Sequence, residues 1–159
     1  MSADATFEDG AERPLRLWAQ DADDLTVVSA LMQDAVFPAG EMRWRASRRQ
    51  FLVLLNRFRW EDVEAARARG RDPERVRSLL EIGDVGRVRS QGVRRDDRDV
   101  VLSLLSLGWA PGADGTGTLT LTLAGDGAVS LDVECIDVRL TDVTRPYRAT
   151  SGHIPEHND

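Results

Sequence analysis

The sequence of 159 residues contains no lysine, because all 21 of its basic residues are arginines. This absence excludes Schiff-base catalysis and the phosphate-binding lysine of a P-loop. A single cysteine, Cys135, excludes an internal disulfide and a multi-cysteine zinc site. The two histidines, His153 and His157, lie within the last seven residues, so a histidine base would have to come from the C-terminal end. We therefore expect no catalytic residue, no bound metal and no cofactor.

Long apolar runs are also missing. The longest stretch without charge covers residues 100–113, which is too short for a helix to span a bilayer. The N-terminal residues are acidic and lack the basic and apolar segments of a secretory signal. An unpaired thiol suits a reducing compartment. We predict a cytoplasmic protein that has no membrane partner.

The net charge of −6 is unevenly distributed along the chain. Residues 43–77 carry eleven arginines and five acids, a net charge of +6. The flanking segments 1–42 and 78–159 have net charges of −7 and −5. A basic segment between acidic flanks either attracts an anionic partner or pairs with those flanks inside the fold. The internal pairing is the simpler expectation.

One amphipathic helix is predicted near the N-terminus. Asp21 stands where an N-cap residue is favoured, and Asp23 and Asp24 place negative charge in the first helical turn. Apolar residues follow at helical spacing until Pro38, which cannot continue a helix. This apolar stripe consists of Leu25, Val28, Leu31, Met32 and Ala35.

Short β-rich segments make up most of the remaining sequence, several with strict alternation of apolar and polar residues. Because short turns separate them, we expect mainly antiparallel pairing. The predicted fold class is α+β, a sandwich or partly closed barrel of about seven or eight strands, with the helix over an open edge or end. The strand segments are 15–19, 42–46, 51–58, 76–82, 85–92, 100–109, 119–123 and 129–135.

The sequence also predicts how the chain is divided. Residues 1–13 are expected to be a mobile acidic tail, 14–147 a single globular domain and 148–159 a polar tail. Within the domain, the apolar pattern disappears over residues 59–74, which favours an exposed excursion. The apolar parity shifts at 136–140, which indicates a bulge or a turn of helix.

Arginines and aromatic residues are interleaved in two predicted strands, and this is the most distinctive candidate site. Arginine and aromatic side chains are enriched at protein interfaces, so a protein partner or a second copy of the chain is the favoured interpretation. The alternative is single-stranded nucleic acid, held by arginine–phosphate pairs and stacked bases. A third interpretation is structural arginines beside core aromatics. The candidate binding residues are Arg43, Arg45, Arg57, Arg59 and Trp60.

Two observations weaken the nucleic-acid alternative. Strand alternation places Arg43 and Arg45 on one face and turns Trp44 inward, so the cations and the ring need not share a surface. The sequence pI of about 5.0 is also far below that of a typical nucleic-acid-binding domain.

Three further clusters have simple structural interpretations. Glu134 and Asp137 form the carboxylate pair that a small enzyme would need, but no sequence feature separates their pKa values. Cys135 continues the inward parity of the preceding strand, so we expect a core residue. The acids in 94–99 alternate with arginines, which favours a solvated turn over a calcium loop.

Three strings of sequence resemble a known family. They are Leu54–Glu61 (LLNRFRWE), Leu31–Val36 (LMQDAV) and Val133–Asp137 (VECID). Together they are similar to DUF2948, a family of small uncharacterised proteins found mainly in alphaproteobacteria, over roughly residues 15–147. The resemblance implies family membership but no activity and no residue roles. We therefore predict a cytoplasmic, non-catalytic binding domain, most simply for another protein.

Overall fold

The computed structural model describes residues 13–94 and 96–148, which form one mostly antiparallel sheet of eleven strands. The strands follow the order β1-β10-β5-β4-β2-β7-β8-β9-β6, while β3 pairs only with β4 and β11 only with β5. The edge strands β1 and β6 do not pair, so the sheet is open. The strands are β1 (Arg16–Ala19), β2 (Val36–Pro38), β3 (Met42–Arg45), β4 (Gln50–Phe58), β5 (Glu74–Ile82), β6 (Val85–Gln91), β7 (Val101–Pro111), β8 (Gly117–Leu123), β9 (Ala128–Val133), β10 (Val138–Asp142) and β11 (Tyr147–Arg148).

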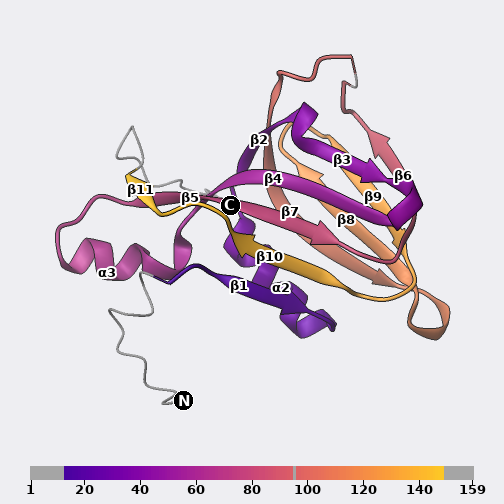
Figure 1. Cartoon of the computed structure of the whole chain (residues 1–159), viewed down its shortest axis with the longest axis horizontal. Coiled ribbons are helices and arrows are strands. Elements are labelled where there is room, and N and C mark those ends of the chain that lie inside the picture. The colour runs from indigo at the N-terminus through magenta and orange to yellow at the C-terminus, as the bar shows by residue number, and fades with distance from the viewer. Residues whose placement is uncertain (1–12, 95, 149–159) are drawn as a thin grey trace.

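The sheet curves so that its two halves enclose a common core (Figure 1). One half contains β1, β10, β5, β4 and β3, and the other contains β7, β8, β9 and β6. Alternating residues point inward from both halves: Val53 and Leu55 from β4 and Leu119 and Leu121 from β8 belong to the same buried cluster. Period-two alternation in the sequence therefore fixes which side chains remain outside.

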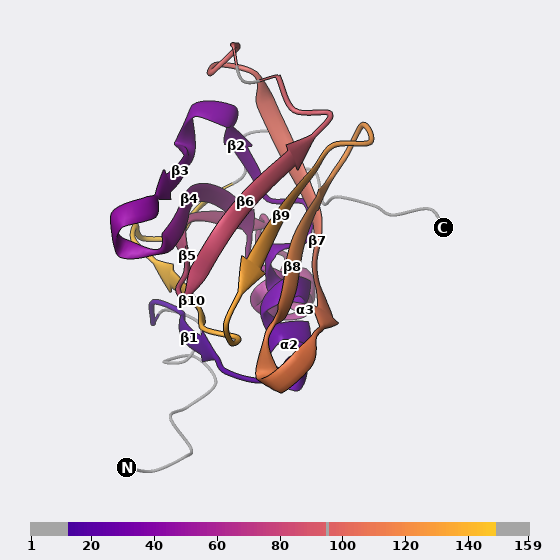
Figure 2. The ribbon, with the colours of Figure 1, turned by 90° about the vertical axis from the view of Figure 1, so that its right-hand side faces the viewer.

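Helix α2 (Ala22–Met32) lies inside the curve of the sheet, at one end of it (Figure 2). The Asp21 side chain caps it by accepting a hydrogen bond from the Asp24 amide at 2.8 Å. Leu25, Val28 and Met32 are buried against the core, which confirms the predicted helix, but it ends at Met32, so the buried Ala35 of the predicted stripe lies beyond it.

The predicted count of seven or eight strands is wrong, because the described chain contains three strands that the hydrophobic pattern missed. β2 and β11 have only three and two residues, too few for an alternation to be recognised. The parity shift at 136–140 marks the start of a new strand, β10, after the turn that follows β9, and not a turn of helix. The predicted tail 148–159 includes Arg148, which belongs to β11 and is in register with Glu74 of β5. The other residues of this tail lie outside the described ranges.

The segment 59–74, predicted to be an exposed excursion, is exposed at Glu61, Glu64 and 67–72 but is folded and partly buried elsewhere. This segment contains a 3₁₀ turn, η3 (Trp60–Asp62), and a short helix, α3 (Val63–Ala68). Val63 and Ala66 are buried, and so is the charged Asp62. The sequence pattern failed because the segment is held partly by buried ion pairs, which have no apolar periodicity.

None of the helices in the described part of the chain combines the length and apolarity needed to cross a bilayer.

Candidate functional site

The outer side of the half-sheet β1-β10-β5-β4-β3 presents an unusual set of side chains, which we call the arginine face. The strand register aligns Trp18, Arg139, Glu81, Leu52 and Arg43 in one row across all five strands. By the same alternation, six arginines and one glutamate point outward from these strands, a formal charge of +5 in a protein of net charge −6. The arginines are Arg16, Arg43, Arg45, Arg75, Arg77 and Arg139.

Apolar side chains occupy the middle of the arginine face. Leu52, Leu54 and Leu79 are half-buried, and Leu54 is paired with Leu79 across β4 and β5. At the β1 edge, Trp18 is 52% exposed. The Arg139 guanidinium lies over its ring, 4.4 Å from the centroid, and its indole Nε1 donates a hydrogen bond to Asp137 at 2.7 Å. The face therefore has an apolar centre surrounded by cations.

The arginines of this face are poorly neutralised. Within residues 13–94 and 96–148, only Arg139 among them has an ion pair, with Asp137 at 4.0 Å. Arg75 instead donates to the Asn56 carbonyl and side-chain oxygens and lies over the Phe58 ring. Most of the positive charge on this face therefore has no carboxylate partner among the described residues.

The structure separates the five predicted binding residues into two groups. Arg43 and Arg45 are exposed on the arginine face. Arg57 and Arg59 are buried, with exposures of 0% and 4%, at the end of β4. Trp60 is half-buried there and donates its indole hydrogen to the Gln33 carbonyl at 2.8 Å. The sequence string places all five close together, but they do not form one surface.

Trp44 lies on the predicted side of β3 but is not buried there. It is paired with Phe51, whose side chain is buried, so the predicted alternation is correct. However, β3 pairs only with β4, so nothing in the sheet extends beyond Trp44, and the ring stays 38% exposed.

Arg57 is the centre of a buried polar cluster. Its guanidinium makes a bidentate pair with Glu61 at 2.8 and 2.7 Å and contacts Asp142 at 3.1 Å. Asp142 also accepts from the Ser78 hydroxyl at 2.7 Å and from the Leu15 amide at 2.8 Å. Five segments of the chain therefore meet at one buried cation.

Charge pairing keeps the Arg57 cluster ionised. Burial by itself would lower the pKa of Arg57, but the hydrogen bond and charge of Glu61, and then Asp142, outweigh burial and raise it. Burial would likewise raise the pKa of Glu61, but its hydrogen bond and attraction to Arg57 lower it below the ordinary value. The cluster holds the end of the sheet together and leaves Arg57 no free donor face for a partner.

A second ion cluster holds the α3 segment. Arg59 pairs with Asp62 at 3.5 Å and with Glu74. Arg71 donates to both oxygens of Asp62 at 3.1 and 3.3 Å. Internal pairing, the simpler expectation for the basic segment 43–77, is therefore confirmed at this end of the segment.

Cys135 is exposed, which corrects its predicted place in the core. β9 ends at Val133, and the following turn reverses the inward parity. The thiol donates to Asp84 at 3.2 Å. This hydrogen bond, then burial, and then the charges of Asp84, Asp137 and Glu134 raise the pKa of Cys135. The thiol is thereby made less nucleophilic.

The candidate carboxylate pair is divided between different partners. Glu134 is 62% exposed and pairs with Arg49 at 2.8 Å, whereas Asp137 accepts from Trp18. In the acidic turn, the Asp99 amide donates to Asp97 at 3.2 Å. No group of three acidic, histidine or cysteine side chains suited to a metal is found in the described ranges, which do not include His153 and His157.

A groove opens at the margin of the arginine face, where β2 and β3 separate from β4. β2 pairs with β4 at Val36, and β3 resumes the pairing at Met42. Residues 37–41 therefore bow away from β4, where only Leu54 and Leu55 lie opposite them. The groove that results has a volume of about 240 Å³.

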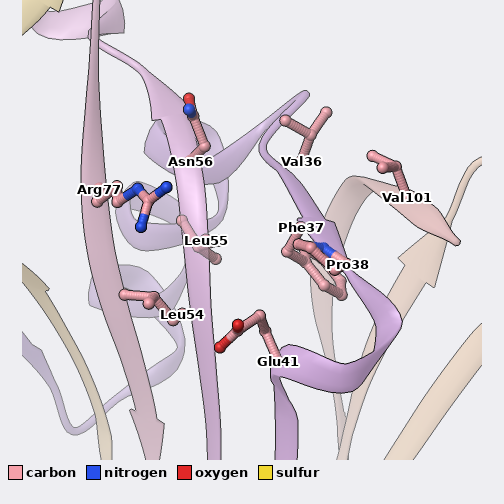
Figure 3. A pocket seen from close by; sticks show the side chains of 9 residues that line it. All are labelled: Val36, Phe37, Pro38, Glu41, Leu54, Leu55, Asn56, Arg77 and Val101. Carbon is pink, nitrogen blue, oxygen red and sulfur yellow. The ribbon is translucent and has the colours of Figure 1, made fainter. Parts of the chain in front are cut away.

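The walls of the groove are apolar and its margins are charged (Figure 3). Leu54 lines the β4 side, and Pro38 and Val101 line the side formed by β2 and β7. Arg77 projects toward the opening from β5, and Glu41 projects from the 3₁₀ turn η1 (Ala39–Glu41) on the other side. Neither of these two side chains has an ion-pair partner among the residues described.

The sequence pattern does not identify Arg77, Arg139 and Trp18 as members of a common surface. Each belongs to a different strand, and the three strands are far apart in the chain. The alternation of Arg16 and Trp18 with Leu15 and Leu17 was the available signal that they face outward. The register that aligns them with β5 and β4 is not written in any local pattern.

The family model DUF2948, described as a protein of unknown function, matches residues 15–157. The chain belongs to this family. The match includes all strands from β1 to β11, and so the whole arginine face and its groove. Family membership confirms the resemblance of the three sequence strings and assigns no activity. No curated protein and no solved structure matches the chain.

Proposed function

We propose that the protein is a non-catalytic binding domain whose arginine face holds an acidic segment of another protein. The single observation that carries the proposal is the outward charge of +5 on one face of a protein with net charge −6. Like-signed side chains brought together with few neutralising partners repel one another, and an acidic partner relieves that repulsion. The proposal includes a cytoplasmic location, which the single thiol favours.

The apolar centre of the face favours a protein partner over a nucleic acid. Leu52, Leu54 and Leu79 offer apolar surface for aliphatic or aromatic side chains, but they form no hydrogen bonds or ion pairs with phosphates or sugars. Trp18 is exposed on this face with its ring covered on one side by Arg139, and Tyr147, 39% exposed beside Arg75, adds only one more ring. Base stacking along a strand would need several free rings. The acidic remainder of the protein also repels a long polyanion.

The buried contacts explain why this function needs a rigid sheet. The Arg57 cluster ties β4, β5 and β10 together at one end, so the outward arginines of these strands keep fixed spacings. A preformed surface loses less conformational entropy on binding. Arg57 and Arg59 thus support the face without belonging to it.

The proposal is tested by titrating isotope-labelled protein with a short peptide in which glutamates alternate with leucines and following chemical shifts by NMR. We expect shifts at the Leu52, Leu54 and Leu79 methyl groups and at the Trp18 indole, with affinity that falls as salt is added. A single-stranded oligonucleotide and anionic lipid vesicles serve as competing probes. Shifts on this face caused by either of them and not by the peptide would overturn the proposal.

The variant R43E/R45E supplies the matched test. Its two reversals should weaken peptide binding about tenfold, because exposed ion pairs contribute up to about 1 kcal/mol each and reversal adds repulsion. The control R87E/R94E changes the net charge equally at exposed positions outside the face. Equal losses in both variants would show that only net charge matters and would contradict a specific face.

A further inference from the structure

We infer that the groove between β4 and the bowed segment 37–41 anchors one large apolar side chain of the bound segment, with an acidic residue on the Arg77 side of that anchor. This inference rests on the proposed function. It adds a chemical pattern to the partner, namely an apolar residue flanked by an acid on one side and by a non-acidic residue on the other.

The size of the groove supports a single side chain. Pockets for cofactors and drug-sized ligands usually have volumes of roughly 300–1,000 Å³. At about 240 Å³ this groove is smaller, yet it has room for a leucine, phenylalanine or tryptophan side chain. Interface energy is commonly concentrated in one or two such anchors seated in apolar pockets.

The groove is built from well-held backbone. The bowed segment is fixed at its two ends by the pairings of Val36 and Met42 with β4. In between, the Ala39 amide donates to the Val100 carbonyl at 2.8 Å and the Gly40 amide donates to the Arg98 carbonyl at 2.9 Å. The opening therefore does not depend on an induced movement of this segment.

The two charged margins give the groove a direction. Arg77 continues the positive charge of the arginine face up to one margin, whereas Glu41 places a negative charge at the other. A carboxylate next to the anchor is attracted on the Arg77 side and repelled on the Glu41 side. A segment with acids on both sides of its anchor consequently binds less well than one with an acid on the correct side alone.

The test uses two peptides of identical composition in a glycine–serine background. In one, a phenylalanine is preceded by glutamate and followed by lysine, and in the other these two charges are exchanged. We expect the wild-type protein to prefer one order by about threefold to tenfold in Kd, measured from the Leu54 and Val101 methyl shifts.

The double variant E41R/R77E should invert this preference, because it exchanges the charges of the two margins. Both positions are at least partly exposed, so the fold should be retained, and thermal unfolding verifies this. The variant R87E is the control and should keep the wild-type order. Equal binding of the two peptides, an unchanged preference in E41R/R77E, or no shift at Leu54 and Val101 with either peptide would overturn the inference.

These outcomes are separable from failure of the proposed function. If the glutamate–leucine peptide still shifts Leu52, Leu79 and Trp18 while the two ordered peptides bind equally, the arginine face stands and the groove assignment fails. If R43E/R45E binds the glutamate–leucine peptide as well as the wild-type protein does, the proposed function itself fails.

Discussion

The arginines of β3 and those at the end of β4 lie in neighbouring strands and have opposite surroundings. Arg43 and Arg45 are exposed and have no carboxylate partner in the described structure. Arg57 is fully buried and contacts two carboxylates. The same residue type therefore occurs in two settings, exposed without a carboxylate partner in the described structure and buried in ion pairs that hold the sheet. Local sequence does not distinguish the two uses.

The largest effect on the free energy of unfolding is expected from the removal of Arg57. The variant R57A leaves Asp142 buried and Glu61 partly buried without their cation, and we expect a loss of about 3 kcal/mol in the free energy of unfolding. Denaturant unfolding measures this change. The variant R43A is the matched control and should differ from the wild type by less than about 0.5 kcal/mol. Similar losses in the two variants would contradict the division into buried and exposed arginines.

A second, smaller effect concerns acid pH. Because folding lowers the pKa of Glu61, the Arg57–Glu61 pair stabilises the protein above the carboxylate's unfolded pKa, and this stabilisation is lost as pH falls through the lower folded pKa. Unfolding measured across the acid range should therefore show a decline in stability that the variant E61Q lacks in part. An identical pH profile for E61Q would show that Glu61 is not held by Arg57 in solution.

Much of the fold follows from the sequence, and the reasons are visible in particular elements. The helix at Ala22–Met32 combines an N-cap with an apolar stripe, so two local signals agree, although it ends six residues before Pro38. Strand β8 alternates threonine and leucine from Thr118 to Leu123, whereas β4 is recognised by its run of apolar, β-favouring residues. Elements as short as β2 and β11 form by pairing with neighbouring strands, and local propensity does not predict them.

The candidate site was less accessible to sequence reasoning. Arg43 and Arg45 were identified because they alternate within one strand. Arg77 and Arg139 join them only through the register of β10 and β5 with β4, which is a property of the assembled sheet. The burial of Arg57 similarly depends on Asp142, which is 85 residues away in the chain. Long-range pairing is what a single sequence does not display.

The smallest expected effect concerns the Cys135 thiol, which, like Arg57, has its pKa raised by neighbouring carboxylates. Removal of the Asp84 charge by D84N should lower the pKa of Cys135 toward its ordinary value, because Asp84 is the main cause of the increase. Asparagine tolerates the positive φ of 55° at this position. Alkylation by iodoacetamide at constant pH should become modestly faster in D84N. A slower or equal rate would show that the hydrogen bond between the thiol and Asp84 is not formed.

The bowed segment 37–41 has a consequence for how members of this family diverge. Because β2 ends at Pro38 and β3 starts at Met42, residues can be added to or removed from the turn Ala39–Glu41 between them without shifting the register of either strand. Length changes elsewhere in the sheet would turn core side chains outward. The shape of the groove can therefore change through this turn while the strand pairing of the sheet stays the same.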